Sequence, residues 1–283
     1  MQFYNRDDVI QLTPEWHGER LDDGRPKVSD DIIRRMELVT NEEAWQVLSQ
    51  HGYKFQFCGE MAMVHPDRVL VGRAVTAVMV PMRPDLHEYL LDFGHEKEQR
   101  RGFFNVWVVD SLQENDVMVV DLFDKIYEGT FSGGNLSTTV AARTHRGQVI
   151  YGGIRDLQQI VSIDHLQTYY RGVDPTPIRE VTLTGINIPC RIGHAICMPG
   201  DVVLGTRSGV TFIPPQLAEA IVIASEKTRL KDQFGFERIR QGIYSSAEID
   251  RQWEPHIARD FAEWRKTHTP DSLKHLEWDD ENP

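Results

Sequence analysis

Hydrophobic residues recur in short dense blocks from about residue 68 onward, and polar segments rich in glycine and proline separate these blocks. The stretch 68–81 is β-branched and continuously apolar, which predicts a strand buried on both faces. Similar blocks predict further strands at 105–112, 117–123, 148–153, 168–172, 180–189 and 191–198, and a pair joined by a tight turn within 199–215.

Helical patterns alternate with these blocks. Thr40 with Glu43 forms a capping box that predicts a helix start, and this helix ends at Gly52. Ser29 and Ser245 predict further starts, the latter for a tryptophan-bearing helix that ends near residue 266. Further helices are expected at 84–102, 136–147, 156–163 and 215–230.

The order strand, loop, helix, strand predicts one α/β domain with additions at both ends. Residues 1–28 carry charges and prolines without periodicity, and they are interpreted as an arm that wraps a larger body. The tail from His268 is acidic and is expected to be solvated.

Composition narrows the class of protein. The 283 residues carry a net charge of −12, which argues against a nucleic-acid phosphate backbone as partner. No run of 18 apolar residues occurs, so no membrane partner is expected. The N-terminus has no apolar signal core, and the three cysteines form no CxxC pair. We therefore expect reduced thiols and a cytoplasmic location.

A glycine-bearing loop at 129–138 follows a predicted strand and opens a helix. The free N–H groups and the positive dipole end of such a helix can hold a carboxylate or a phosphate. Gly133 and Gly134 would let a ligand approach the backbone. The motif is neither GxGxxG nor a P-loop, so a plain connecting loop is the alternative interpretation.

Arg155 and Asp156 follow the predicted strand at 148–153. Neighbours on an extended chain point to opposite sides, so the pair can present a cation and an anion to two parts of one pocket. Arginine can grip a carboxylate with two parallel hydrogen bonds, and a single aspartate can hold a hydrated Mg²⁺. The alternative is that the two side chains form separate structural salt bridges.

The sequence gives weaker support for other residues as metal-binding or catalytic groups. The eleven histidines show no HxxxH or HxH spacing, which argues against zinc. Glu128 and Asp124 flank the glycine loop and could add negative charge near a metal, although loop carboxylates are more often solvated.

Four segments together resemble the RraA-like family: VMVVDLF, SGGNLSTTVAARTHRGQVIYGGIRD, YYRGVDP and PGDVVLGTRSGVTFIP. That family includes regulators of ribonuclease E activity and metal-dependent 4-hydroxy-4-methyl-2-oxoglutarate aldolases, which also decarboxylate oxaloacetate. The resemblance implies a single swivelling α/β/β/α domain at 69–230. A helical N-terminal extension at 1–68 and a helical C-terminal extension with an acidic tail at 231–283 would flank it.

The resemblance also implies roles for individual residues. Arg155 matches the arginine that binds the substrate carboxylate, and Asp156 matches the aspartate that anchors Mg²⁺ or Mn²⁺. Asn135 and Leu136 match the loop whose N–H groups bind the pyruvate end of the substrate. A further acid is implied from the C-terminal helical region of a neighbouring subunit. Its candidates in this chain are Glu226 and Asp232.

One departure from the family pattern concerns Gly134. The aldolases carry an aspartate at this position, 21 residues before the arginine, and it lies near the metal-bound waters. Its loss removes a negative charge and a group able to handle protons, which Asp124, Glu128 or Asn135 could replace in part.

Three functional hypotheses follow. The first is a metal-dependent carbon–carbon lyase acting on a short 2-oxo acid or a sugar-derived oxo acid, by retro-aldol cleavage or decarboxylation. The second is another metal-assisted enzyme, such as a sugar-acid lyase, hydratase or hydrolase. The third is a non-catalytic protein-binding regulator like the ribonuclease E inhibitors. The resemblance further implies a homotrimer or homohexamer with sites at subunit interfaces.

Overall fold

The computed structural model describes residues 5–279. These residues form two compact units, and the division lies between Ala218 and Glu219. The break lies within the range 69–230 that the resemblance implies for the core. Every helix in the described part of the chain is too short or too polar to cross a lipid bilayer.

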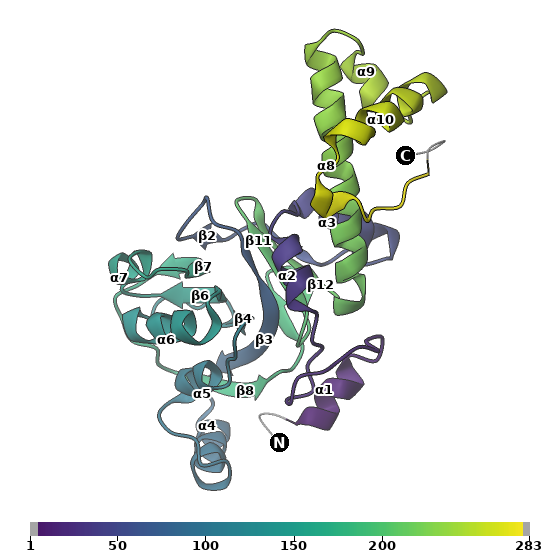
Figure 1. Ribbon diagram of the computed structural model, residues 1–283. Helices are drawn as coiled ribbons and strands as arrows, with labels where there is room; N and C mark the ends of the chain where they lie inside the picture. The colour runs from purple at the N-terminus through teal and green to yellow at the C-terminus, as the bar shows by residue number, and fades with distance from the viewer. Residues whose placement is uncertain (1–4, 280–283) are drawn as a thin grey trace. The chain divides into compact units, whose positions relative to one another are not determined.

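A ten-stranded mixed sheet forms the centre of the first unit (Figure 1). Its main path runs β1-β12-β11-β3-β4-β6-β7-β2, with β5 paired to β6 and β8 paired to β3. The strands are β1 (Phe57–Cys58), β2 (Ala62–Met63), β3 (Leu70–Pro81), β4 (Asp116–Asp121), β5 (Thr130–Ser132), β6 (Gly147–Ile154), β7 (Gln167–Val173), β8 (Val181–Ile186), β11 (Val202–Thr206) and β12 (Gly209–Ile213).

Helices connect these strands and pack on the sheet. The helices of the first unit are α1 (Arg6–Leu12), α2 (Asp30–Met36), α3 (Asn41–Gln50), α4 (Pro84–Asp92), the π-helix η1 (Phe93–Lys97), α5 (Phe104–Asp110), α6 (Gly134–Thr144), α7 (Leu157–Val161) and the 3₁₀-helix η2 (Pro215–Leu217). The expected starts at Ser29 and Thr40 are confirmed, because Ser29 caps α2 and Thr40 forms the capping box of α3.

Both faces of the sheet are buried. Met118 and Val120 of β4 join the core cluster that contains Trp107 of α5 and Val140 of α6. Val117 and Val119 alternate to the other face. There they pack with the hairpin of β9 (Cys190–Ile192) and β10 (Ala195–Cys197). The mixed α/β class expected from the sequence is therefore confirmed.

The parallel part of the sheet positions the site. Strands β4, β6 and β7 run parallel, and β5 is parallel to β6. Their carboxyl ends therefore meet at one edge, where ligands commonly bind in open α/β sheets. Helices α6 and α7 follow β5 and β6 directly, so their N-termini open at this edge.

The stretch 105–112 is a helix, so its prediction as a strand was wrong. Its valines and Trp107 form a short continuous apolar run, and such a run does not distinguish a buried strand from a buried helix. In α5, Phe104, Trp107 and Val108 point into the core cluster on one helical face. The stretch 191–198 is also two strands rather than one, since Gly193 turns the chain with φ of 61°.

The N-terminal segment is tied to the sheet by a buried arginine. Arg25 is fully buried, and its two Nη atoms lie 2.8 and 3.0 Å from the carboxylate oxygens of Asp116. Its Nε donates to Asp23 Oδ2 at 2.6 Å. Strands β1 and β2, which precede residue 69, pair with β12 and β7 of the central sheet.

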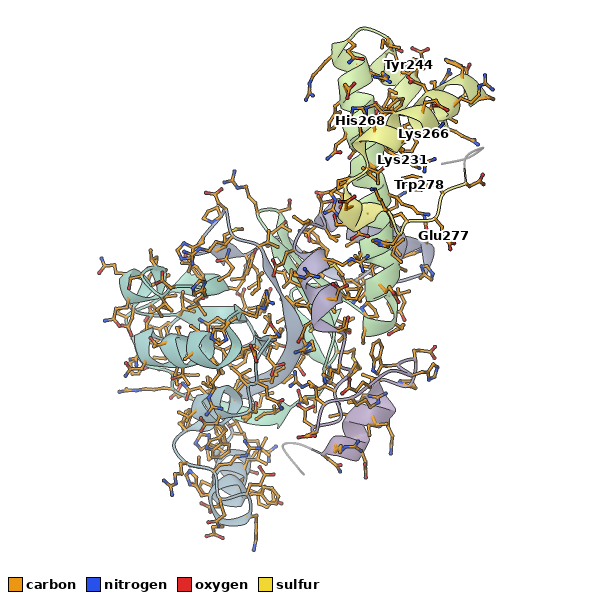
Figure 2. The ribbon with its side chains drawn as sticks, in the orientation of Figure 1. Lys231, Tyr244, Lys266, His268, Glu277 and Trp278 are labelled. Carbon is orange, nitrogen blue, oxygen red and sulfur yellow. The ribbon has the colours of Figure 1, made fainter. Side chains whose placement is uncertain are left out.

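The second unit is helical and has its own aromatic core (Figure 2). Its elements are α8 (Ala218–Arg240), α9 (Ser246–Ile249), α10 (Pro255–His268) and the 3₁₀-helix η3 (Asp271–Leu273). The helix expected from Ser245 to about 266 is two helices, with Pro255 in the first turn of the second. Most described residues of the tail from His268 are exposed, as expected, although Leu276 is buried and Trp278 packs against the same core.

The cysteines are reduced in this structure. Cys58, Cys190 and Cys197 are free thiols, as their sparse spacing predicted, and the structure shows that all three are buried. Burial raises the pKa of all three thiols.

Candidate functional site

Arg155 and Asp156 lie where strand β6 ends. The Arg155 N–H donates to the Ser132 carbonyl at 3.0 Å, which continues the pairing of β6 with β5. Asp156 then leaves the extended conformation, with φ 55° and ψ 38°, and becomes the N-cap of α7. The left-handed conformation is costly for a residue other than glycine, so it indicates a position that the surrounding structure constrains.

This turn brings the two side chains to the same place. Arg155 Nε lies 3.7 Å from Asp156 Oδ2, and the side chains are 42% and 40% exposed. The expectation that they point to opposite sides was wrong, because it assumed that the extended chain continues through residue 156. Both groups therefore stand side by side and accessible to a ligand.

The start of helix α6 faces this pair. The Gly134 N–H donates to Asp156 Oδ2 at 3.1 Å. The N–H groups of Asn135 and Leu136 also lie in the first helical turn, where no carbonyl of a preceding turn can accept them. The positive end of the helix dipole therefore adds to the guanidinium of Arg155 in favouring an anion.

Gly133 is required here for space rather than for backbone freedom. Its φ of −123° and ψ of −162° are extended. A Cβ on this residue would lie 2.3 Å from Asp156 Oδ2 and 2.9 Å from Arg155 Nε. Only glycine lets the two side chains close over the helix start.

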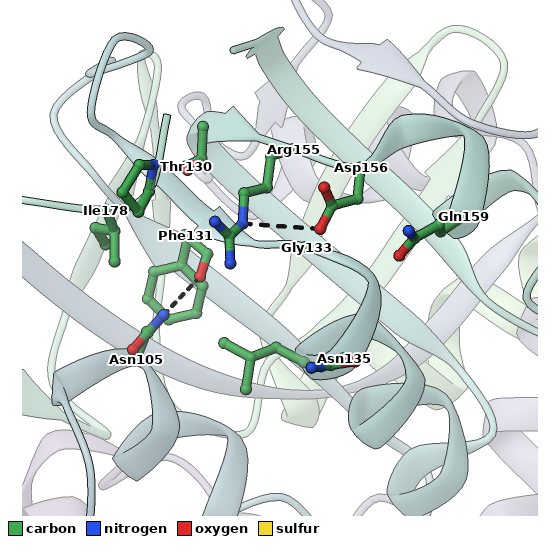
Figure 3. Close-up of a pocket in the computed structure, with 11 residues that line it drawn as sticks. Asn105, Thr130, Phe131, Gly133, Asn135, Arg155, Asp156, Gln159 and Ile178 are labelled. Carbon is green, nitrogen blue, oxygen red and sulfur yellow. Dashed lines mark hydrogen bonds and ion pairs between the residues drawn. The ribbon is translucent and has the colours of Figure 1, made fainter. Parts of the chain in front are cut away.

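These groups line one cavity of about 340 Å³ (Figure 3). Its lining residues come from α5, β5, α6, the end of β6, α7 and the segment before β8: Asn105, Thr130, Phe131, Gly133, Asn135, Leu136, Arg155, Asp156, Gln159, Pro177 and Ile178. Five residues named from the sequence are therefore brought together. Gly134 is not in the lining set and contributes its N–H to Asp156 instead.

The additional acids named from the sequence lie elsewhere. Glu128 is not among the lining residues, and its Oε1 lies 3.7 Å from Arg179 Nη1. Glu226 and Asp232 belong to the second unit, and neither lines the cavity. Glu226 is buried, with Oε2 3.6 Å from His275 Nε2. Their assignment to a catalytic role stays a prediction.

Several lining residues were not found from the sequence. Asn105 was missed because its segment was predicted to be a strand. Its Nδ2 donates to the Phe131 carbonyl at 2.9 Å, so it fixes α5 against β5. Gln159 could have been found, since a residue three positions after the helix N-cap Asp156 lies near the same end of α7.

Gln159 and Gly134 exclude each other sterically. A Cβ at position 134 would lie 2.0 Å from Gln159 Oε1. The amide of Gln159 thus occupies the space into which the first atoms of any side chain at position 134 would project. In Figure 3 this amide points from α7 toward Asp156 and Gly133.

The donor set fits a hydrated cation held by one carboxylate. Asp156 Oδ2 accepts the Gly134 N–H, while Oδ1 has no hydrogen-bond partner among the described residues. Magnesium keeps most of its waters and needs only one or two protein carboxylates. Within residues 5–279, no three His, Cys, Asp or Glu side chains are grouped so that they could hold a metal, so a zinc-type cage does not fit.

Known proteins resemble this chain in sequence and in fold. Residues 26–212 match the RraA-like family, described as Aldolase/RraA. A protein of Halalkalibacterium halodurans named "Putative 4-hydroxy-4-methyl-2-oxoglutarate aldolase" is 27% identical over 135 residues, which cover 46% of this chain and 62% of that protein. An uncharacterized protein of Methanocaldococcus jannaschii is 27% identical over 133 residues, which cover 47% of this chain and 64% of that protein. The match thus spans less than two thirds of these relatives.

Solved structures share the fold. Streptomyces coelicolor RraAS2, described as an unusual member of the RNase ES inhibitor RraA protein family, superposes with a TM-score of 0.61. It is 19% identical, and the match covers 75% of this chain and 97% of that one. An uncharacterized protein from Pseudomonas syringae pv. tomato gives a TM-score of 0.62 at 18% identity, covering 80% of this chain and all of that one. At these identities the likeness shows the fold alone, whereas the family match covers well over half of the sequence. The chain belongs to the RraA-like family.

Proposed function

We propose that this protein is a divalent-metal-dependent carbon–carbon lyase that cleaves or decarboxylates a 2-oxo acid in the cavity at Arg155. One observation carries the proposal. A guanidinium, a carboxylate and the opening turn of a helix line the same small cavity. Family membership and the relative named as an aldolase support the same class of reaction.

Arg155 is the group that would hold the substrate carboxylate. Its side chain is 42% exposed, and its Nε lies 3.7 Å from Asp156 Oδ2. A planar guanidinium can make two parallel hydrogen bonds to a carboxylate, which fixes the orientation of the bound acid. The N–H groups of Asn135 and Leu136 would add hydrogen bonds to the same end of the substrate.

Asp156 would hold the cation, either Mg²⁺ or Mn²⁺. The Gly134 N–H fixes one of its oxygens and leaves the other available. When bound, the cation supplies Lewis-acid stabilisation of the negative charge that develops on the keto oxygen as the carbon–carbon bond breaks. Phe131, Leu136 and Ile178 give the cavity apolar walls that limit water around the reacting carbon.

The lining set contains one carboxylate, Asp156, so retro-aldol cleavage needs a further group to accept the hydroxyl proton. We propose that a neighbouring subunit of a homotrimer or homohexamer supplies it. Asp232 is the better of the two candidates because it is exposed, whereas Glu226 is buried within its own unit. Light scattering tests the assembly, and a monomer at micromolar concentration would refute it. Decarboxylation of oxaloacetate needs no such base and therefore provides the simpler assay.

The first test measures oxaloacetate decarboxylation with Mg²⁺ or Mn²⁺ and after EDTA treatment. Arg155→Lys should raise KM about tenfold or more, because a point charge cannot make the bidentate contact. Asp156→Asn should weaken Mn²⁺ binding, read by electron paramagnetic resonance without substrate. A lysine variant with unchanged kinetics, or an asparagine variant with unchanged Mn²⁺ affinity, would remove that residue from the proposed role. Exposed Gln158→Ala on α7 is the control.

A further inference from the structure

The charges in the cavity restrict which acid it can take. Arg155 is the only cationic side chain, and Asp156 the only anionic one, among the lining residues that the structure describes. Arg179 follows the lining residue Ile178 but stands outside this set, with Nη1 3.7 Å from Glu128. The cavity therefore offers a strong partner to one substrate carboxylate, and a second carboxylate would meet no cationic side chain within it.

Besides the two charged groups, the cavity contains two side-chain amides that can form hydrogen bonds with a ligand. Asn135 and Gln159 both line the cavity, and neither side chain has a hydrogen-bond partner among the described residues. Asn105 is already committed, because its Nδ2 donates to Phe131 and its Oδ1 accepts from Val106. A primary amide both donates and accepts hydrogen bonds, as a hydroxyl group does, whereas an ionised carboxylate only accepts. The free amides therefore match hydroxyl groups better than a second carboxylate.

The placement of Gln159 depends on Gly134. Because a Cβ at position 134 would come within 2.0 Å of Gln159 Oε1, the glycine is what admits this amide beside Asp156. A charged side chain at position 134 could otherwise lie in this part of the cavity. With Gly134, the neutral amide of Gln159 lies there instead, and it both donates and accepts hydrogen bonds. It keeps the side-chain charge of the cavity at zero, from one guanidinium and one carboxylate.

We propose that the cavity selects a hydroxylated monocarboxylic acid, a sugar-derived 4-hydroxy-2-oxo acid, over a dicarboxylic one, and that Gln159 is a specificity-determining residue. This inference rests on the proposed function. In the reaction, the C4 hydroxyl loses its proton, the C3–C4 bond breaks, and its electron pair passes to C3, which takes up a proton. The products are pyruvate and a hydroxylated aldehyde, so atoms and charge balance without a further reagent.

Equilibrium binding of three six-carbon probes tests the selection without turnover. Gluconate has one carboxylate and five hydroxyl groups, glucarate has two carboxylates, and hexanoate has one carboxylate and no hydroxyl. None has a 2-oxo group, so a failure of the lyase chemistry does not affect the measurement. Calorimetric titration of the full chain, with and without Mg²⁺, should give gluconate a Kd at least about tenfold lower than either other probe.

Variants of α7 assign the effect to Gln159. Gln159→Leu should reduce the advantage of gluconate over hexanoate by about threefold to tenfold, because it removes hydrogen bonds that only the hydroxyl groups can use. Gln158→Leu, on the same helix but outside the lining set, should leave the ratio unchanged. Tighter or equal binding of glucarate, no gluconate binding at millimolar concentration, or an unchanged ratio in Gln159→Leu would overturn the inference. Selective binding of gluconate by a protein without lyase activity would instead refute only the proposed function.

Discussion

Gly133→Ala separates the geometry of the candidate site from the stability of the fold. The added Cβ would lie 2.3 Å from Asp156 Oδ2, whereas ordinary van der Waals contacts of a Cβ begin at 3.4 Å. The carboxylate must therefore move by about 1.1 Å, the difference of these two distances. Such a shift breaks its 3.1 Å hydrogen bond with the Gly134 N–H and also displaces Arg155.

We expect Gly133→Ala to reduce the catalytic rate more than the stability of the fold. A misplacement of about 1 Å at a reacting centre can reduce the rate about a hundredfold, which is close to 2.7 kcal/mol of transition-state stabilisation. The cost in folding free energy should stay below about 1 kcal/mol, because Gly→Ala at an extended residue also restricts the unfolded chain. Asp156 and Arg155 are partly exposed, so both side chains can move into solvent.

The assay pairs kcat/KM for oxaloacetate decarboxylation with thermal unfolding of the same preparation. We expect a drop of about two orders of magnitude in kcat/KM with a change in Tm within about 4 °C. The matched control is Gln158→Ala, which should change neither quantity. Full activity in Gly133→Ala would refute the reasoning, since the two side chains could not then be needed in their present positions. A large loss of Tm would show that the glycine serves the fold instead.

Two further predictions concern stability. Arg25→Met leaves Asp116 and Asp23 buried without their cation, so it should cost about 3–5 kcal/mol of unfolding free energy in denaturant titration. The exposed pair of Arg83 and Asp85 provides the control, and Arg83→Met should leave the unfolding free energy nearly unchanged. Equal losses in the two variants would contradict the buried network. Burial raises the pKa of Asp201 to about 7. Between about pH 4 and about pH 7 the folded state therefore keeps a proton that the unfolded state has lost. The contribution of Asp201 to the unfolding free energy falls as the pH rises from about 4 to about 7. Asp201→Asn should therefore reduce the loss of unfolding free energy between pH 5 and pH 7 by at most about 3 kcal/mol, and an unchanged pH dependence would show that Asp201 is ionised in the fold.

Local pattern was sufficient for most of the secondary structure. The blocks at 68–81 and 117–123 are strands β3 and β4, and the capping box of Thr40 begins α3. These features depend on residues close together in the chain, so periodicity and capping chemistry reveal them. The apolar run 105–112 is the exception, because a short continuous apolar run is compatible with either a buried helix or a buried strand.

The candidate site could be predicted only in part. The sequence shows a glycine loop, then a helix, then an arginine followed by an aspartate. This order predicted that Arg155, Asp156 and the start of α6 belong to the site. The lining residues Asn105 and Ile178 come from segments distant in sequence, and only the packing of α5 and the chain before β8 brings them to the cavity.

The sequence by itself determined the family, the mixed α/β class and the residues at the carboxyl ends of parallel strands, because these follow from local order along the chain. Tertiary structure decided three further points: the left-handed turn that brings Asp156 beside Arg155, the exclusion between Gly134 and Gln159, and the complete burial of Arg25. Each of these depends on a distance between atoms that the chain brings together only on folding. The physical reason is that side-chain pattern records which groups are available, whereas close packing in three dimensions decides which of them can occupy the same space.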